Sequence, residues 1–357
     1  MLTRRNFCKQ IAALSIAMKA ADIYGADDSD YPPEAVSDFC KRLKPVGRIL
    51  ETEGYYVWCV APIYGSDGKV HVFYSRWLDR YGMGGWLHKC EIAHAVSDRP
   101  EGPYTHEDVA LPPRPGYWDS TTCHNPHIQY LDGMYYLFYM GNSDGTVFTK
   151  RIGMAKSQSL YGPWERTDHP LLDVGGRGAW DDCCTTNPSF LRHPNGENWL
   201  YFKSWNEKDY REQTSGIRAN RKYGLATARE IEGPYTRYGG NPIVDFSVYG
   251  GNRQVEDAYV YMEDGKYKML MRDMGYFDHY AGLIFESPDG MNWSKPKIAW
   301  YGASKYFEEP PAPKHLSRYG RFERPQLLMK NGRPQYLFNA MQGGKYMTAS
   351  GFVFLIT

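Results

Sequence analysis

Five segments of the chain share one order of apolar and polar stretches. Each has a short apolar β-type run, a polar turn that contains glycine, and a second run rich in Tyr, Phe, Leu or Val. The segments begin at Ala61, Asn125, Asn187, Asp257 and Arg324, so successive copies start 62 to 70 residues apart. Each segment predicts a β-hairpin, and the regular spacing predicts a repeat architecture.

A second pattern follows four of these hairpins, beginning at Ile92, Ile152, Tyr223 and Gly282. Each copy adds a third β-type run, a turn with glycine, and an aromatic residue that opens an outer strand. Four-stranded units at this spacing predict an all-β fold, a five-bladed β-propeller, over residues 26–357. A β-sandwich would require both patterns to coincide by chance. The fifth hairpin has no outer strand after it, so either segment 46–50 supplies one or the fifth blade is short.

Composition agrees with this fold and excludes several classes of function. Aromatic residues make up 15% of the chain, and 36 Gly and 23 Pro favour turns. The net charge of +1 gives no global field for nucleic acid, and no later run is apolar over the length of a bilayer. The six cysteines after Cys8 lack metal-ligand spacing. We therefore expect no nucleic-acid partner and no membrane span, and the composition leaves the oligomeric state open.

The N-terminus resembles a twin-arginine export signal. Residues 3–9 read TRRNFCK, and a short apolar run and small residues near Gly25 follow. We expect residues 1–25 to be a signal peptide and the mature protein to be exported to a bacterial periplasm. An amphipathic N-terminal helix is the alternative.

The innermost strand of a propeller blade lines the axis, so the residues at its start should meet in one funnel that can enclose a small ligand. The end of the second strand of each hairpin opens at the same face as the start of the first. The two sets of positions, which include Ala61, therefore predict substrate contacts from Arg76, Trp77, Asn125, Asn187, Lys203, Arg272 and Arg324. The cationic members of this set favour an anionic sugar, either a uronate or a sulfated one, although neutral sugars also use Arg and Lys.

A Trp-Asp pair precedes two of the hairpins at the same distance. The stretches WDSTTCHNP and WDDCCTTNP place Asp119 and Asp181 at equivalent positions on loops that enter the predicted funnel. Either aspartate could act in catalysis or bind hydroxyl groups, or it could cap a tight turn. The two tryptophans could stack on a sugar ring or fill space between blades.

The repeat pattern as a whole resembles the five-bladed glycoside hydrolases of families 43, 32 and 117. The resemblance covers nearly all of residues 26–357, but it is architectural. Family 43 carries Asp before the inner-strand proline of its first two blades and Glu two positions before that of the third. Here these slots hold Ala61, Asn125 and Thr186, so the family's catalytic set cannot be carried over. The resemblance implies a carbohydrate substrate, no required cofactor, and a central water or a cation such as calcium, for which the sequence shows no ligand set.

The carboxylates lie instead in the fourth and fifth hairpins. Glu323 keeps the Glu-x-Pro spacing and is the predicted general acid, and Asp257 occupies the family's Asp slot and is the predicted base or nucleophile. Glu256 is the alternative base, because neighbouring residues of a strand point to opposite sides. Arg272 and Arg324 could keep one carboxylate ionised. The same residues could also form ion pairs between blades.

His124 gives a different candidate for the acid. Family 117 enzymes use a His as general acid, and His124 directly precedes Asn125 at a predicted funnel position. A structural hydrogen-bonding role is the alternative. We therefore predict an exported, exo-acting glycoside hydrolase with an inverting mechanism. A glycoside phosphorylase and a non-catalytic sugar-binding propeller are the alternatives.

Overall fold

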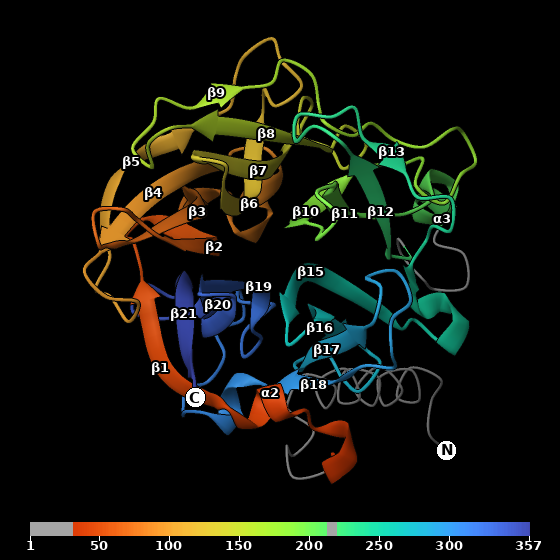
Figure 1. Cartoon of the computed structure of the whole chain (residues 1–357). Coiled ribbons are helices and arrows are strands. Elements are labelled where there is room, and N and C mark those ends of the chain that lie inside the picture. Colours follow the sequence, from red (N-terminus) through yellow and green to blue (C-terminus); the bar gives the residue numbers. More distant parts are fainter. Residues whose placement is uncertain (1–30, 213–219) are drawn as a thin grey trace, which may run out of the picture.

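The computed structural model describes residues 31–212 and 220–357, and the expected signal peptide over residues 1–25 lies outside the described residues. Five four-stranded units surround one axis, with one strand of each unit nearest the centre (Figure 1). The predicted five-bladed propeller is confirmed. Its strands pair antiparallel within each blade, as expected for consecutive hairpins.

The strands follow chain order from the axis outward in the first four blades. Blade one contains β2 (Tyr55–Tyr64), β3 (Val70–Leu78), β4 (Glu91–Ser97) and β5 (Thr105–Leu111). Blade two contains β6 (Thr122–Leu131), β7 (Met134–Asn142), β8 (Arg151–Ser157) and β9 (Glu165–Arg166). Blade three contains β10 (Thr186–Arg192), β11 (Asn198–Ser204), β12 (Lys222–Ala228) and β13 (Thr236–Arg237), with β14 (Val244–Asp245) also paired to β12. Blade four contains β15 (Gln254–Glu263), β16 (Lys266–Met274), β17 (Gly282–Ser287) and β18 (Lys297–Trp300).

The fifth blade joins the two ends of the described chain. It contains β19 (Glu323–Lys330), β20 (Arg333–Gly343) and β21 (Thr348–Ile356), and its outer strand is β1 (Leu43–Leu50). Leu43 pairs with Ile356 and Leu50 with Gly351. Of the two alternatives left open by the sequence, the structure shows the first, in which segment 46–50 belongs to the outer strand of the fifth blade. This pairing closes the ring, because β1 precedes the first blade in the chain and pairs with the last.

Short helices lie in the connections. The α-helices are α2 (Asp38–Lys41) and α3 (Glu207–Glu212), and the 3₁₀ turns are η1 (Pro33–Ala35), η2 (Asp79–Tyr81), η3 (Met83–Leu87), η5 (Phe246–Tyr249) and η6 (Ala303–Lys305). Within the described ranges, no helix combines the length and apolar character that a bilayer crossing requires.

The apolar cores lie between neighbouring blades and leave the axis to polar groups. Five clusters of buried residues each draw side chains from two adjacent blades. Between blades two and three, for example, Phe138 stacks on Phe190 with 4.6 Å between ring centroids. Hydrophobic burial therefore holds the blades together, and the centre is free for chemistry.

Each inner strand contains one residue with left-handed backbone geometry, where its pairing with the next strand shifts register. These residues are Cys59, Asn125, Asn187, Asp257 and Arg324, with φ between 52° and 68°. Asn and Asp tolerate this conformation better than Cys or Arg. In blade one the equivalent position is Cys59, so the sequence-based placement of Ala61 there was two residues off. The sequence analysis had aligned Pro62 with Pro126 and Pro188 of blades two and three. In the structure, the residue equivalent to these two prolines is Val60.

Candidate active site

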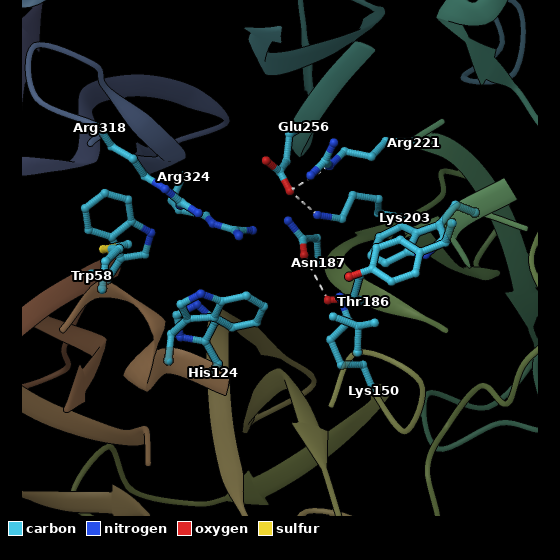
Figure 2. A pocket seen from close by; sticks show the side chains of 15 residues that line it. Trp58, His124, Lys150, Thr186, Asn187, Lys203, Arg221, Glu256, Arg318 and Arg324 are labelled. Atoms are coloured by element: carbon cyan, nitrogen blue, oxygen red, sulfur yellow. Dashed lines mark hydrogen bonds and ion pairs between the residues drawn. The ribbon is translucent and has the colours of Figure 1, made fainter. Parts of the chain in front are cut away.

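A cavity of about 200 Å³ lies on the axis and receives side chains from all five inner strands. Figure 2 shows these side chains facing one another across the pocket. The inner strands provide Trp58, His124, Thr186, Asn187, Glu256 and Arg324. The remaining wall comes from later strands and connections: Met83, Trp86, Val147, Lys150, Lys203, Trp205, Tyr210, Arg221 and Arg318. The predicted funnel thus exists, and it is enclosed enough to hold a small ligand.

The five left-handed residues form a chain of polar contacts around the axis. The Cys59 thiol donates to Asn125 Oδ1 at 3.0 Å, and Asn125 Nδ2 donates to Asn187 Oδ1 at 3.0 Å. Asn187 Nδ2 then donates to Asp257 Oδ1 at 2.7 Å. The Arg324 backbone N–H donates to Asp257 Oδ2 at 3.2 Å, and its guanidinium pairs with Asp257 Oδ1 at 2.6 Å. Both Asp257 oxygens are therefore engaged, and Asp257 does not line the cavity.

The position directly before each left-handed residue supplies most of the inner-strand lining, together with Asn187 and Arg324. Trp58, His124, Thr186 and Glu256 occupy these positions in blades one to four, and all four line the cavity. Glu323 is the fifth member and does not line it. It is fully buried between Arg272 and Arg318, each 3.1 Å away. Burial opposes ionisation of Glu323, but the two arginine charges outweigh it and lower the pKa of Glu323.

Glu256 is the one carboxylate among the lining residues of this cavity. Lys203 forms a hydrogen-bonded ion pair with it, and Arg221 and Arg272 each lie 3.4 Å from one of its oxygens. Burial opposes ionisation of Glu256, but these charges and that of Arg324 hold its pKa well below its usual range. For Asp257, in contrast, burial outweighs the charge of Arg324 and raises the pKa. Glu256 is therefore ionised in the folded protein, a state that can accept a proton and cannot donate one.

Two lysines of the pocket are buried, and they differ in their partners. Burial lowers the pKa of Lys203 to about 8, although the charge of Glu256 opposes the shift. Burial also lowers the pKa of Lys150. The Lys150 ammonium lies 4.3 Å from the ring centre of Trp205 and 5.7 Å from that of Trp86. Across the described part of the chain, no carboxylate lies within ion-pair distance of Lys150.

His124 lies on the other side of the pocket from Glu256 (Figure 2). Its ring stacks on Trp86 at 5.4 Å and meets the edge of Trp77 at 5.9 Å. The ring nitrogens lie 3.4 Å from Cys90 Sγ and 3.9 Å from Cys59 Sγ. Burial lowers the pKa of His124 well below 6.5, and neighbouring Arg and Lys charges add to this effect. The imidazole is therefore neutral in the free protein.

Several predicted contact residues lie behind the pocket wall. Arg76 pairs with Glu91 at 2.8 Å, and Trp77 stacks on Tyr56 at 5.4 Å. Neither lines the cavity, and the same holds for Asn125 and Arg272, which contact residues that do.

Asp119 and Asp181 also lie away from the cavity. Asp119 is fully buried and pairs with Arg114 at 3.0 Å and with Arg166 of β9 at 3.1 Å. Asp181 pairs with Arg237 of β13 at 2.6 Å. These aspartates therefore join equivalent loops to the outer strands of blades two and three, a role that the sequence analysis did not anticipate.

Sequence reasoning missed Trp58, Trp86, Lys150, Arg221 and Arg318. Lys150 and Arg221 carried a usable signal, because each directly precedes the third strand of its blade, β8 or β12. The repeats KRIGMAKS and RKYGLATA show this equivalence. Trp58 was missed because of the register error in blade one. Trp86 and Arg318 lie in connections whose course no local pattern determines.

The residues at the axis do not fit a central cation. Of the described residues, no group of three or more His, Cys, Asp and Glu is placed to hold a metal ion. The Asp257 carboxylate faces the Arg324 guanidinium, whose charge would repel a cation. The six described cysteines are buried and unbridged.

Comparison with known proteins extends the description of the fold. No protein-family model and no curated protein matches the sequence. Solved structures do match. One is Zg3597, a family 117 glycoside hydrolase of the marine bacterium Zobellia galactanivorans, with a TM-score of 0.63 and 16% identity over 88% of this chain and 90% of that one. This chain shares the fold of this solved glycoside hydrolase.

Two further structures have the same fold. A protein described as a glycoside hydrolase has a TM-score of 0.66 at 13% identity, over 91% of this chain and 95% of that one. CoXyl43, a family 43 β-xylosidase/α-arabinofuranosidase from a compost metagenome, has a TM-score of 0.57 at 18% identity, over 87% of this chain and 93% of that one. The architectural resemblance to families 43 and 117 is confirmed.

Proposed function

We propose that this protein is a glycoside hydrolase that removes a terminal sugar, with Glu256 as general base and His124 as proton donor. The observation that carries the proposal is the convergence of all five inner strands on one enclosed cavity with a single lining carboxylate. A small axial cavity suits one sugar ring better than the middle of a chain. Trp58, Trp86 and Trp205 offer aromatic faces on which a ring can pack.

The chemistry follows from the charge states of these two groups. The ionised Glu256 takes a proton from water as the water oxygen attacks the anomeric carbon. The bond from that carbon to the leaving oxygen breaks, and that oxygen receives a proton from His124, which has taken up this proton from solvent before the step. Glu256 then releases its proton to solvent, so the cycle consumes one water and no net proton. Lys203 is poorly placed as the donor because it is hydrogen-bonded to Glu256, whereas an inverting pair flanks the scissile bond from opposite sides. Lys203 instead keeps Glu256 ionised.

The sequence-based assignment of Glu323 as acid and Asp257 as base stays a prediction. The geometry supports it less than it supports the assignment of His124 and Glu256. Both carboxyls lie behind the wall and are held by arginines. In our proposal, Asp257 positions Asn187 and Arg324, and Glu323 positions Arg318. Inversion and export remain parts of the proposal, and export is supported by the residues TRRNFCK near the N-terminus.

The direct test is hydrolysis of a panel of oligosaccharides and aryl glycosides, followed by variants on the best substrate. Glu256→Gln and His124→Asn should each lower kcat by roughly 10²–10⁴-fold in protein that remains folded at the assay temperature. Glu286→Gln, at an exposed carboxylate far from the pocket, is the matched control. Near-normal turnover by Glu256→Gln would contradict the assignment. If only Glu323→Gln and Asp257→Asn abolish turnover while remaining folded, the sequence-based pair is correct.

The cationic character of the pocket favours a second candidate, a glycoside phosphorylase. Five cationic side chains and one carboxylate line the cavity, and inorganic phosphate would bring its own nucleophilic oxygen. Turnover that requires phosphate and yields a sugar 1-phosphate would identify this reaction. Sugar binding without any turnover, with or without phosphate, would contradict both candidates and leave a carbohydrate-binding propeller.

A further inference from the structure

The pocket wall carries more positive than negative charge. Lys150, Lys203, Arg221, Arg318 and Arg324 line the cavity together with Glu256. Behind this lining, Asp257 and Glu323 are paired with Arg324 and Arg318, and Arg272 lies between Glu256 and Glu323. Six cationic side chains thus accompany three carboxylates around the pocket.

Lys150 is the lining cation that, among the described residues, has no carboxylate within ion-pair distance. Its side chain belongs to a residue that is only 3% exposed, and its ammonium faces the rings of Trp205 and Trp86. The other four lining cations each lie within 3.4 Å of a carboxylate oxygen. A buried charge without a partner is costly, so such groups usually meet a counter-charge in the functional state.

The surroundings of Lys150 suit a sugar that carries an acidic group. Trp86 and Trp205 flank the ammonium with apolar faces, and Thr186 and Asn187 add polar groups nearby in the pocket (Figure 2). Aromatic faces beside a buried cation favour a ring with one charged substituent. Glu256 lies on the far side of the pocket from Lys150 (Figure 2). A ring whose charged substituent contacts Lys150 would therefore place its anomeric end next to Glu256.

We infer that the pocket binds an oxyanion at Lys150, and that this oxyanion is the carboxylate or sulfate substituent of an acidic sugar. The inference rests on the proposed function, because the oxyanion would bind in the same pocket as the sugar that is cleaved. It specifies acidic sugars as the substrate class of that pocket. Free phosphate and free sulfate are also oxyanions and could bind at Lys150 in the same way. The experiment below therefore tests the free anions separately from the acidic sugars.

The test measures binding, so that it does not depend on turnover. Calorimetric titrations would compare D-galacturonate with D-galactose, D-glucuronate with D-glucose, and galactose 6-sulfate with galactose, and would include inorganic phosphate and sulfate alone. For at least one pair, the acidic sugar should bind roughly 10- to 100-fold more tightly than its neutral counterpart. Lys150→Met should remove this preference and Lys150→Arg should keep part of it. Lys266→Met, at an exposed lysine, loses the same charge far from the pocket and should change nothing.

Each outcome has a distinct meaning. Binding of free phosphate or sulfate through Lys150, without preference among the sugars, would support the oxyanion site and overturn its assignment to an acidic sugar. If no oxyanion binds, or if Lys150→Met binds oxyanions as tightly as the parent, the inference is wrong, and unfolding temperatures verify that each variant is folded. A protein that binds an acidic sugar through Lys150 but cleaves no glycoside would keep this inference and contradict the hydrolase proposal.

Discussion

Arg324 and Asp257 occupy equivalent positions on neighbouring inner strands, and their side chains form a 2.6 Å ion pair at the propeller axis. Both residues have left-handed backbone geometry, and Asp257 also accepts from Asn187. The slots that hold catalytic aspartates in family 43 thus form a bracing chain in this protein. The positions directly before them carry the pocket-lining groups His124 and Glu256, and Asn187 and Arg324 of the bracing chain also line this pocket.

The first prediction concerns this pair. Asp257→Asn should lower the free energy of unfolding by about 3–5 kcal/mol, because the variant leaves the buried Arg324 guanidinium without its counter-charge. Asp264→Asn, in an exposed turn, should stay within about 0.5 kcal/mol of the parent. Urea unfolding measures both. Equal stability of the two variants would contradict a bracing role for Asp257.

The second prediction concerns closure of the ring by β1. Leu50 is buried where β1 meets β21, so Leu50→Ala should cost about 2–5 kcal/mol of unfolding free energy. Val46 lies in the same strand and is 43% exposed, so Val46→Ala should cost much less. Chemical denaturation compares the two. Similar losses would show that β1 does not stabilise the fifth blade through its buried side.

The third prediction concerns stability in acid. The pKa values of Glu256 and Glu323 are lowered in the folded protein, so the stability they contribute is present above their unfolded pKa of about 4.3 and is lost as the pH falls below it. The urea concentration at the midpoint of unfolding should therefore fall as the pH is lowered from about 5 to about 3. Glu256→Gln and Glu323→Gln should each flatten this drop, while Glu286→Gln should follow the parent. Parallel curves for all four proteins would contradict the assigned charge states.

The fourth prediction links ligand charge to His124. The charges of Arg324, Arg318, Lys150 and Lys203 lower the pKa of His124 in addition to burial. A bound anion offsets those charges, so the pKa of His124 should rise with an acidic sugar and change less with its neutral counterpart. NMR titration of labelled histidine measures both, with His124→Asn identifying the signal. Equal shifts for the acidic and neutral sugars would contradict this coupling.

Local sequence patterns determined the architecture of the protein. Each hairpin is specified by neighbouring residues, with apolar runs on both sides of a glycine turn, so five copies could be recognised without knowing their contacts. The partner of β21 could also be named, because an unpaired outer edge needs a strand and segment 46–50 was available. Glu256 and Asp257 were expected to face opposite sides because the strand period is two, and only Glu256 reaches the cavity.

Tertiary structure decided which polar residues meet. Asn125 and Asn187 belong to the residue types that favour left-handed geometry, but Cys59 does not, so the register of blade one became visible only through its contact with Asn125. Asp119 looked equivalent to a funnel residue, yet its partner Arg166 lies 47 positions away along the chain. Lys150 and Glu256 come from different blades and share one pocket. A hairpin depends on adjacent residues, whereas the charge state of a buried group depends on every strand that packs around it.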